Sequence, residues 1–378
     1  MKSRTVIILV VLAIAALAIT AMLERERPGQ LDSLVGQRLM PDLEGQLNDI
    51  TALRVVASDA DGTATITRGE GGWVVAEKSG YAADAGAIRQ LLIRLAEARV
   101  LEEKTSNPTF YGRLGVGDVG ADGGGVQLSL EGLPATRSVI VGNLETRAGR
   151  GTYLRLAGGE QSYLVDAELD PPGTAVEWLD RSLFDVPADE VRAITVRQDD
   201  GELLRIESGD AGLEVLDVPE GRALSSPTAP RSMAGVLNAL TFEDVTRAVD
   251  FREEPPAAVA EYRLDDGRMV TIDLWQRDEG RFAALRVAYD PGATPPSDGG
   301  DPADAGENAA AGESADGADP VEETRPPAEP GDADEAQASA SATALNDRLA
   351  PWVFRIPAFK YDLMARKLED LLAPPEIE

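Results

Sequence analysis

Two stretches of the chain alternate apolar and polar residues in the way that a half-buried β-strand requires. They are residues 50–57 (ITALRVVA) and 191–198 (VRAITVRQ), and each follows a short acidic lead. Asp61-Gly62 and Asp200-Gly201 come next, each before a second strand (TATITR or ELLRIES). Because Asp-Gly suits the two positive φ angles of a type I′ turn, both stretches are predicted to open a β-hairpin. Third strands are expected at residues 73–75 and 213–215.

An amphipathic helix is expected next in both halves, because apolar residues recur there at 3.6-residue spacing. In the first half, Asp84 is the expected N-cap. The apolar face of the first helix consists of Ile88, Leu91, Leu92, Leu95 and Ala96. The second half repeats that face at a constant offset of 145 positions, at Met233, Val236, Leu237 and Leu240. Val100 and Val245, after the two helices, keep the same offset.

Each half then continues as a predicted β-meander. The first has strands at 126–130, 138–142, 152–156 and 162–165 and ends in an amphipathic segment at 174–183. The second has strands at 260–264, 269–274, 282–289 and 352–356 and ends in a helix at 358–372. The shared order of elements predicts an α+β fold with a tandem duplication of antiparallel hairpin, helix and meander units. The alternative is a chance resemblance between two ordinary α+β units.

An acidic stretch interrupts the second half. Residues 290–346 hold 14 acidic residues and one basic residue, Arg325, with eight prolines and no aromatic residue. Such a composition buries too little apolar surface to offset the entropy of ordering, so a disordered insertion is expected. Because loop-closure entropy grows slowly with length, its host need not unfold. A solvated spacer and a specific binding arm are the two interpretations of its role.

The N-terminus predicts a membrane anchor. Residues 5–23 (TVIILVVLAIAALAITAML) carry no charge, and a helix of this length roughly matches the ~30 Å hydrocarbon core of a bilayer. Residues 1–4 are basic, which predicts a cytoplasmic N-terminus and export of everything from residue 24 onward. A cleaved signal peptide is the alternative, because Ala16, Ala18 and Ala21 offer an A-x-A-like site. Without cysteine, a lipoprotein is excluded.

Composition narrows the classes of function. The chain has 66 acidic and 36 basic residues, a formal net charge of -30, and neither histidine nor cysteine. It therefore has no Cys/His zinc site, no thiol nucleophile, no disulfide and no Ser-His-Asp triad. A strongly acidic chain repels phosphate backbones, so no nucleic-acid partner is expected.

Several short motifs suggest chemistry but lack the sequence context for it. Residues 115–120 match GxGxxG, yet no strand precedes them and more glycines follow, so a flexible connector is expected instead of a nucleotide site. Asp59-Ala60-Asp61-Gly62 lacks the remaining ligands of a calcium loop. The paired carboxylates before Gly201 and Gly267 are expected in solvated turns. Lys78 and Ser79, as strand neighbours, are expected to diverge.

Four tryptophans and one amphipathic helix are further candidates for contact sites. Trp73, Trp275 and Trp352 are expected in strands and Trp178 in a helical segment, each as a core anchor, with a partner-facing hot spot as the alternative. The helix at 358–372 is expected to close the second core, with docking to a membrane partner as the alternative. No catalytic, cofactor-binding or metal-binding residue is predicted.

The pattern resembles the bacterial domain-of-unknown-function 4340 family. The resemblance is carried by residues 50–56, by Gly72-Trp73-Val74-Val75, by residues 88–95, and by Tyr153-Leu154-Arg155-Leu156 with Tyr163-Leu164-Val165, and it covers about residues 45–290 and 350–372. It implies an accessory envelope subunit of a gliding-motility-type ABC transporter, beside an ATPase, a multi-span permease and a periplasmic subunit. The family supplies no established catalytic residues.

These observations together predict a non-enzymatic, single-pass protein of the bacterial inner membrane, with its bulk in the periplasm. Alternatives are a scaffold or binding module for polysaccharide or an outer-membrane partner, and a carboxylate-dependent hydrolase. The predicted divisions are listed in chain order: cytoplasmic 1–4, transmembrane 5–23, linker 24–48, first repeat 49–186, second repeat 187–289, disordered insertion 290–346, and the rest of the second repeat 347–378.

Overall fold

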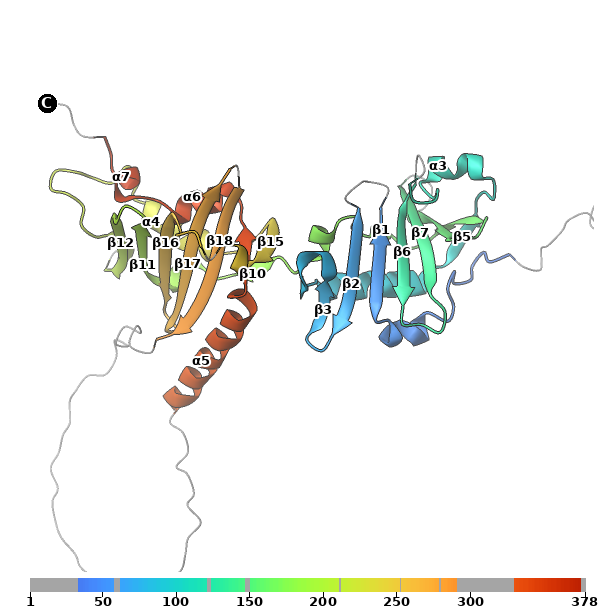
Figure 1. The fold of residues 1–378 in the computed structure, drawn as a ribbon, viewed down its shortest axis with the longest axis horizontal. Coiled ribbons are helices and arrows are strands. Elements are labelled where there is room, and N and C mark those ends of the chain that lie inside the picture. The colour runs from blue at the N-terminus through green and yellow to red at the C-terminus, as the bar shows by residue number, and fades with distance from the viewer. Residues whose placement is uncertain are drawn as a thin grey trace, which may run out of the picture. The chain divides into compact units, whose positions relative to one another are not determined.

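The computed structural model describes residues 33–57, 62–120, 124–146, 150–210, 212–251, 253–278, 280–290 and 330–374. The chain divides into two compact units, Met1–Asp180 (unit 1) and Arg181–Glu378 (unit 2). Each unit is built on an antiparallel sheet accompanied by short helices (Figure 1). The expected α+β class is therefore confirmed.

The sheet of unit 1 follows the hairpin and meander order that the sequence predicts. Its strands lie side by side in the order β4 (Tyr81–Ala82), β3 (Gly72–Val75), β2 (Thr63–Gly69), β1 (Ala52–Val56), β6 (Val126–Glu131), β7 (Arg137–Glu145), β8 (Gly151–Leu156), β9 (Ser162–Val165) and β5 (Val100–Glu103). Alternate residues of these strands are buried, as Leu53 and Val55 are on β1. One face of the sheet therefore forms a hydrophobic core.

Helix α2 (Ala85–Glu97) contributes the other side of that core, as the sequence predicts. The Asp84 side chain accepts a hydrogen bond from the Ala87 amide, which confirms the N-cap. All five residues of the predicted apolar face are buried. The remaining helices of unit 1 are η1 (Glu44–Asp49), η2 (Ala76–Lys78), η3 (Pro108–Phe110), α3 (Tyr111–Leu114) and η4 (Ala175–Trp178).

The sheet of unit 2 has the strand order of unit 1 without a counterpart of β4. Its strands are β13 (Gly212–Val215), β12 (Leu203–Gly209), β11 (Val191–Gln198), β16 (Ala258–Leu264), β17 (Arg268–Arg277), β18 (Gly280–Tyr289), β19 (Trp352–Arg355) and β15 (Asp244–Arg247). A separate pair is β10 (Ser182–Phe184) with β14 (Leu240–Thr241). The helices are η5 (Ala188–Glu190), α4 (Ala229–Ala234), η6 (Gly235–Leu237), η7 (Ala248–Phe251), α5 (Pro330–Leu349), α6 (Ala358–Met364) and α7 (Leu368–Leu371).

Register as well as order agrees between the two sheets. Leu53 of β1 pairs with Ile66 and Leu130, and Ile194 of β11 pairs with Ile206 and Tyr262. Leu53 and Ile194 are both fully buried, so both sheets turn the equivalent residues toward the core. Tyr262 consequently occupies the position that Leu130 occupies in unit 1.

The predicted type I′ turn is wrong for Asp200-Gly201. Of these two residues only Gly201 has positive φ, at 89°. The Gly201 amide donates to the Gln198 carbonyl, and the Gln198 amide donates to the Glu202 carbonyl. This pattern is a type I turn that ends in a left-handed glycine, a hairpin in which aspartate keeps its favoured negative φ. In the first half, residues 58–61 lie outside the described residues.

The second predicted helix is shorter than the first. Its α-helical part ends at Ala234 and continues as one 3-10 turn, η6, and Leu240 lies in β14 instead of on the helix. Gly235 stands at the offset position of Gln90 in α2, and glycine is a poor helix former. Met233, Val236, Leu237 and Leu240 are nevertheless all buried as expected.

Two other predicted helices are also interrupted. The segment at 174–183 forms only η4 and then enters β10. The segment at 358–372 splits into α6 and α7, because the Gln198 side chain donates to the Ala365 and Arg366 carbonyls at 3.0 and 3.3 Å. These carbonyls lie at the break, where a continuous helix would instead use them itself.

The acidic segment is helical from residue 330 onward, which corrects the expected disorder for residues 330–346. Helix α5 packs against β18 and β17, and residues 291–329 lie outside the described residues. Ala342 and Leu349 are buried, and the Asn346 side chain accepts a hydrogen bond from the Val287 amide at 3.1 Å. An alanine-rich helix thus covers the edge of β18 beyond its pairing with β19 (Figure 1).

No helix among the described residues is long and apolar enough to cross a bilayer. The predicted segment at 5–23 lies outside those residues.

Replacing Tyr262 by phenylalanine is expected to raise the free energy of unfolding of unit 2 by about 1 kcal/mol. The Tyr262 hydroxyl is fully buried, has no hydrogen-bond partner among the described residues, and occupies a leucine position of unit 1. Burial also raises the pKa of Tyr262 above its usual value. Urea unfolding of the wild type and the Tyr262→Phe variant measures the difference.

Tyr111→Phe is the matched control, because the Tyr111 hydroxyl donates to the Ser106 and Glu160 carbonyls. It should lower the stability of unit 1 by about 1 kcal/mol. A comparable loss in Tyr262→Phe would contradict the assignment of its hydroxyl as unpaired.

Candidate functional site

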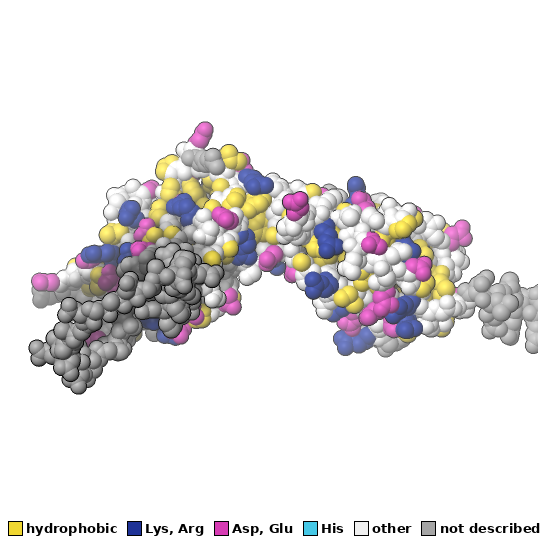
Figure 2. Space-filling model, turned by 90° about the horizontal axis from the view of Figure 1, so that it is seen from below, with side chains coloured by type: hydrophobic (Ala, Val, Ile, Leu, Met, Phe, Trp, Pro, Cys, Tyr) yellow, Lys and Arg dark blue, Asp and Glu magenta, His cyan; other side chains and the backbone are white. Residues whose placement is uncertain are grey.

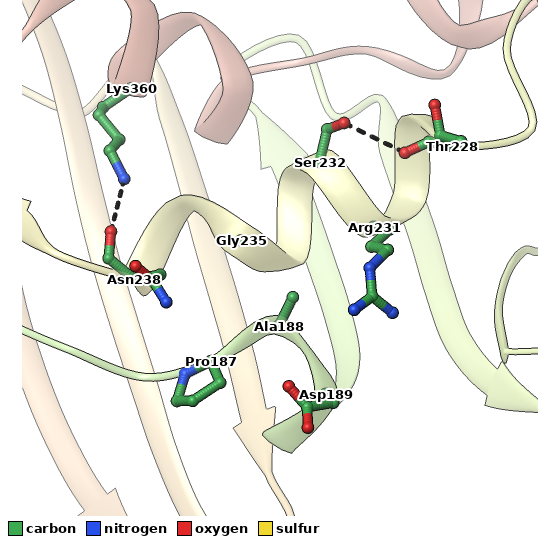
Figure 3. Close-up of a pocket in the computed structure, with 9 residues that line it drawn as sticks. All are labelled: Pro187, Ala188, Asp189, Thr228, Arg231, Ser232, Gly235, Asn238 and Lys360. Carbon is green, nitrogen blue, oxygen red and sulfur yellow. Dashed lines mark hydrogen bonds between the residues drawn. The ribbon is translucent and has the colours of Figure 1, made fainter.

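A polar cavity of about 580 Å³ lies on unit 2 between η5, α4, η6 and α6 (Figure 3). Its lining residues are Pro187, Ala188, Asp189, Thr228, Arg231, Ser232, Gly235, Asn238 and Lys360. A neighbouring cavity of about 300 Å³ shares Ala188, Asp189, Thr228 and Arg231 with it. We call the larger one the η5–α4 cavity.

The local sequence explains why these side chains gather there. Met233, Val236 and Leu237 hold one face of α4 and η6 in the core, which turns Arg231 and Ser232 outward. Buried Tyr361 and Met364 anchor α6 on the same core. Lys360, beside Tyr361, therefore reaches the end of η6, as Figure 3 shows.

Lys360 is held by backbone carbonyls. Its Nζ donates to the Val236 and Asn238 carbonyls, each at 2.8 Å. These carbonyls lie at the end of η6, where helical backbone leaves acceptors without partners and favours a cation. Burial lowers the pKa of Lys360 below its usual value. The lysine therefore acts as a cap on η6.

Arg231 is used differently. It is exposed, extends from α4 toward η5, which carries Asp189, and has no carboxylate within 4.0 Å among the described residues (Figure 3). The Ser232 hydroxyl donates to the Thr228 carbonyl at 3.1 Å. A nucleophilic serine needs a neighbouring base, and a carbonyl is no base. Arg231 therefore equips the cavity to bind a polar or anionic group, and the Ser232 hydroxyl is bonded to a carbonyl instead of a base.

The GxGxxG motif forms a loop that is held against the sheet, which corrects the expectation of a flexible connector. Gly115 ends α3 in the left-handed conformation instead of opening a helix. The loop is held by Arg155, which is 3% exposed and donates to the Val116 and Gly159 carbonyls, each at 2.8 Å, and to Asp118. The Tyr111 ring lies 4.6 Å from the Arg155 guanidinium. Nothing in the sequence TYLRL distinguishes this buried arginine from a surface residue, so its role could not be predicted from the sequence.

The paired carboxylates lie in turns, as expected, and form ion pairs. Asp200 accepts from Lys367 at 2.7 Å, and this ammonium holds the pKa of the Asp200 carboxyl below its usual value. Asp265 lies 3.5 Å from Arg192, and Asp266 accepts from Arg268 at 2.5 Å. A general acid needs a raised pKa, so the shift at Asp200 has the opposite direction. Asp59 to Asp61 lie outside the described residues.

Lys78 and Ser79 do not lie on a strand, which corrects that expectation. Lys78 ends η2, and Ser79 follows it with a φ of 56°. A strand is broken here by a 3-10 turn, and Ser79 takes the left-handed conformation that reverses the chain. The structure thus places this pair in a tight connection between β3 and β4.

Three of the four tryptophans are buried as expected. Trp178 donates to the Pro172 carbonyl at 3.0 Å, and Trp275 donates to the Glu254 carbonyl at 3.0 Å. Trp352 is buried with Arg247 4.0 Å from its ring. Trp73 is only half-buried, and Arg68 lies 5.9 Å from its ring.

Comparison with known proteins gives a family for the chain. The model of the family described as domain of unknown function (DUF4340) matches residues 73–282, more than half of the sequence. The chain belongs to the DUF4340 family. No curated protein and no solved structure matches it.

The DUF4340 match begins at Trp73 in β3 and ends at Phe282 in β18, so it runs from unit 1 into unit 2. It includes most of the residues that carry the resemblance, and residues 50–56 precede it. Arg231 and Asp189 of the η5–α4 cavity fall inside the match, whereas Lys360 falls outside. Among the described residues of this DUF4340 chain, no group of three acidic side chains is arranged to hold a metal ion.

Lys360→Met is expected to lower the free energy of unfolding of unit 2 by about 1–3 kcal/mol, because it leaves the Val236 and Asn238 carbonyls without their donor. Arg231→Gln should change it by less than about 0.5 kcal/mol, because Arg231 is exposed. Thermal unfolding followed by circular dichroism measures both. Equal losses of stability in the two variants would contradict the assignment of Lys360 as a helix cap and of Arg231 as an exposed surface cation.

Proposed function

We propose that this DUF4340 protein is a non-enzymatic, single-pass protein of the bacterial inner membrane. Residues 5–23 would cross the bilayer, the N-terminus would be cytoplasmic, and both units would lie in the periplasm. The uncharged length of residues 5–23 and the basic residues 1–4 support this orientation.

We further propose that the protein serves as an accessory subunit of an ABC-type transport or export system. The partners implied by the family resemblance are an ATPase, a permease and a periplasmic subunit. Family membership supports the proposal, and the η5–α4 cavity supports a binding role over catalysis. The binding role is supported by the hydrogen bonds of the polar side chains in the cavity, because Lys360 and Ser232 both donate to backbone carbonyls.

The two units are proposed to have arisen by tandem duplication. Support comes from the identical order of corresponding strands and from a register that can be followed from strand to strand. The outer hairpins agree as well, since Gly69 pairs with Gly72 in unit 1 and Gly209 pairs with Gly212 in unit 2. Residues 291–329 are proposed to be a solvated disordered spacer, because they are acidic and rich in proline.

The surface composition supports a soluble exported portion. Lys/Arg and Asp/Glu side chains are interspersed over the visible face of each unit (Figure 2). Basic and acidic side chains of unit 2 form surface ion pairs, among them Arg205 with Asp217 at 2.5 Å and Arg222 with Glu369 at 2.8 Å. Isolated exposed pairs contribute little stability, so this mixture mainly favours solubility.

The proposed anchor predicts an intact N-terminus in the membrane. The mass of the protein extracted from inner membranes should include residues 1–23, and alkaline carbonate should not release it, because a spanning apolar helix is not held by charge. A variant without residues 5–23, exported through a cleavable signal, should appear in the soluble periplasmic fraction. Loss of the first ~20 residues from the membrane-extracted protein would instead indicate a cleaved signal peptide.

The proposed accessory role predicts co-purification. Tagged full-length protein, solubilised from native membranes in mild detergent, should recover a multi-span permease and an ATPase in fixed proportion. The variant without residues 5–23 is the control for contacts made through the bilayer. Recovery of the protein alone would count against the transporter role and favour a separate envelope scaffold.

A further inference from the structure

A sheet has two faces, and the face opposite the core is treated differently in the two units. In unit 1 this outer face carries Ser129, Ser138, Ile140, Arg155 and Ser162, which are linked to one another by strand pairing. Although most are polar, Ser129, Arg155 and Ser162 are at most 8% exposed. Some other part of unit 1 must therefore cover this face.

The covering part is residues 104–120 of the connection between β5 and β6, which contain α3 and the GxGxxG loop. Arg155 donates to the Val116 carbonyl, and Val116 is fully buried. The approach is so close that a Cβ at Gly142 of β7 would lie 2.3 Å from the Leu114 carbonyl oxygen. Unit 1 thus covers its outer face with its own chain.

Unit 2 has less chain with which to do so. The corresponding connection, between β15 and β16, is only residues 248–257. It places Phe251 of η7 against Trp275 and Phe282, with ring centroids 5.4 and 5.2 Å apart. This small cluster also buries Val353, and the part of the outer face beside it stays partly exposed at Ala284 and Phe282.

The strand register identifies the residue of unit 2 that occupies the position of Arg155 in unit 1. Arg155 pairs with Ile140 and Ser162, and the matching partners in unit 2 are Asp273 and Val353, which pair with Ala284. Ala284 therefore replaces the buried arginine that holds the covering loop of unit 1. A methyl group offers no donor to a loop, and it leaves space above the sheet.

That space is a groove of about 510 Å³, which we call the Ala284 groove. Its lining residues are Ala248, Phe251, Glu253, Glu254, Pro255, Pro256, Asp273, Trp275, Ala284, Leu285, Arg286, Ala350 and Val353. A smaller pocket of about 140 Å³ continues it past Val353 to Phe282 and Thr246. The floor is apolar, partly exposed at Ala284 and buried at Trp275 and Val353, and the lining carries three carboxylates and one guanidinium.

Two of the three carboxylates of the groove are already paired with arginines, and the third, Glu253, is the one that favours a cationic occupant. Asp273 pairs with Arg286 at 2.5 and 3.0 Å, and Glu254 accepts from Arg277 at 2.7 Å. Glu253 is exposed and has no cation within 4.0 Å among the described residues. With a net charge of -30 on the whole chain, long-range attraction also selects a basic partner.

We propose that the Ala284 groove is the docking site for an extended segment of a partner protein that presents aliphatic side chains to the floor and lysine or arginine to the acidic rim. The segment does in trans what residues 104–120 do within unit 1. The inference rests on the proposed binding role of the protein and names the surface and the chemistry of its partner.

A labelled hexapeptide that alternates lysine and valine tests the proposal, because an extended strand directs the two residue types to opposite sides. Fluorescence anisotropy with the full-length protein in mild detergent should show saturable binding. Matching peptides with valine replaced by serine, or lysine by glutamate, should bind about tenfold more weakly or worse. Equal binding of the serine peptide would reduce the effect to charge alone and overturn the proposal.

Two variants place the binding in the groove. Ala284→Gln fills the floor and should weaken binding about tenfold or more, whereas Ala288→Gln, on the same strand and face but outside the lining, should not. Glu253→Gln should weaken binding of the lysine peptide a few-fold, and Glu220→Gln, exposed and outside the lining, should leave it unchanged. Unchanged binding in both groove variants would overturn the proposal, and retained thermal unfolding of Glu253→Gln excludes misfolding as a cause.

Sedimentation velocity separates a partner protein from a second copy of the chain. A monomer–dimer equilibrium that Ala284→Gln abolishes would show that the groove binds a second copy of the chain, and this result would overturn the proposal. Failure of the transporter co-purification with intact peptide binding would remove only the proposed accessory role. Intact co-purification without peptide binding would overturn only the proposal that the Ala284 groove is a docking site.

Discussion

A twisted antiparallel sheet must be shielded from water wherever its faces are apolar, and one short helix covers only one face. In both units the core lies between the sheet and the helix that follows the first hairpin, α2 in unit 1 and α4 with η6 in unit 2. The two units differ in how the second face of the sheet, opposite the core, is covered. Unit 1 buries Arg155 there and gives it backbone carbonyls, a carboxylate and an aromatic ring as partners. A buried guanidinium is tolerated only with such partners.

The sequence predicts the core face well, because burial alone determines periodicity there. The apolar face of α2, the alternation along β1 and β11, and the meander order were all expected from spacing. What the sequence could not predict depends on contacts between distant residues. Gln198 interrupts the C-terminal helix from 167 residues away, and Asn346 draws an acidic, alanine-rich segment onto β18. Neither glutamine nor asparagine carries a local signal for such a role.

The same limit applies to the candidate site. The η5–α4 cavity brings Arg231 and Lys360 together from separate parts of the chain, with no motif around either residue. Lys360 offered one weak signal, since the chain has only five lysines and this one precedes a buried tyrosine on an amphipathic helix. The GxGxxG sequence, by contrast, offered a strong literal signal with no chemistry behind it. Its glycines permit a left-handed cap at Gly115 and close approach to β7, so a backbone requirement explains the motif.

The two units differ in where they carry additional chain, and this difference connects the fold to the proposed binding role. Unit 1 has its long connection between β5 and β6, over its own outer face, and joins β8 to β9 through residues 157–161. In unit 2 the connection that corresponds to β5–β6 is short, and the connection that corresponds to β8–β9 is the long one, residues 290–351 between β18 and β19. Since loop-closure entropy grows only slowly with length, the β18–β19 connection tolerates this insertion at little cost in stability. Covering the outer face requires specific donors as well as length, and unit 2 has Ala284 where unit 1 has Arg155. The short connection of unit 2 buries Trp275 and Val353 but leaves Ala284 partly exposed, so the outer face of unit 2 keeps apolar surface that a bound partner would shield from water.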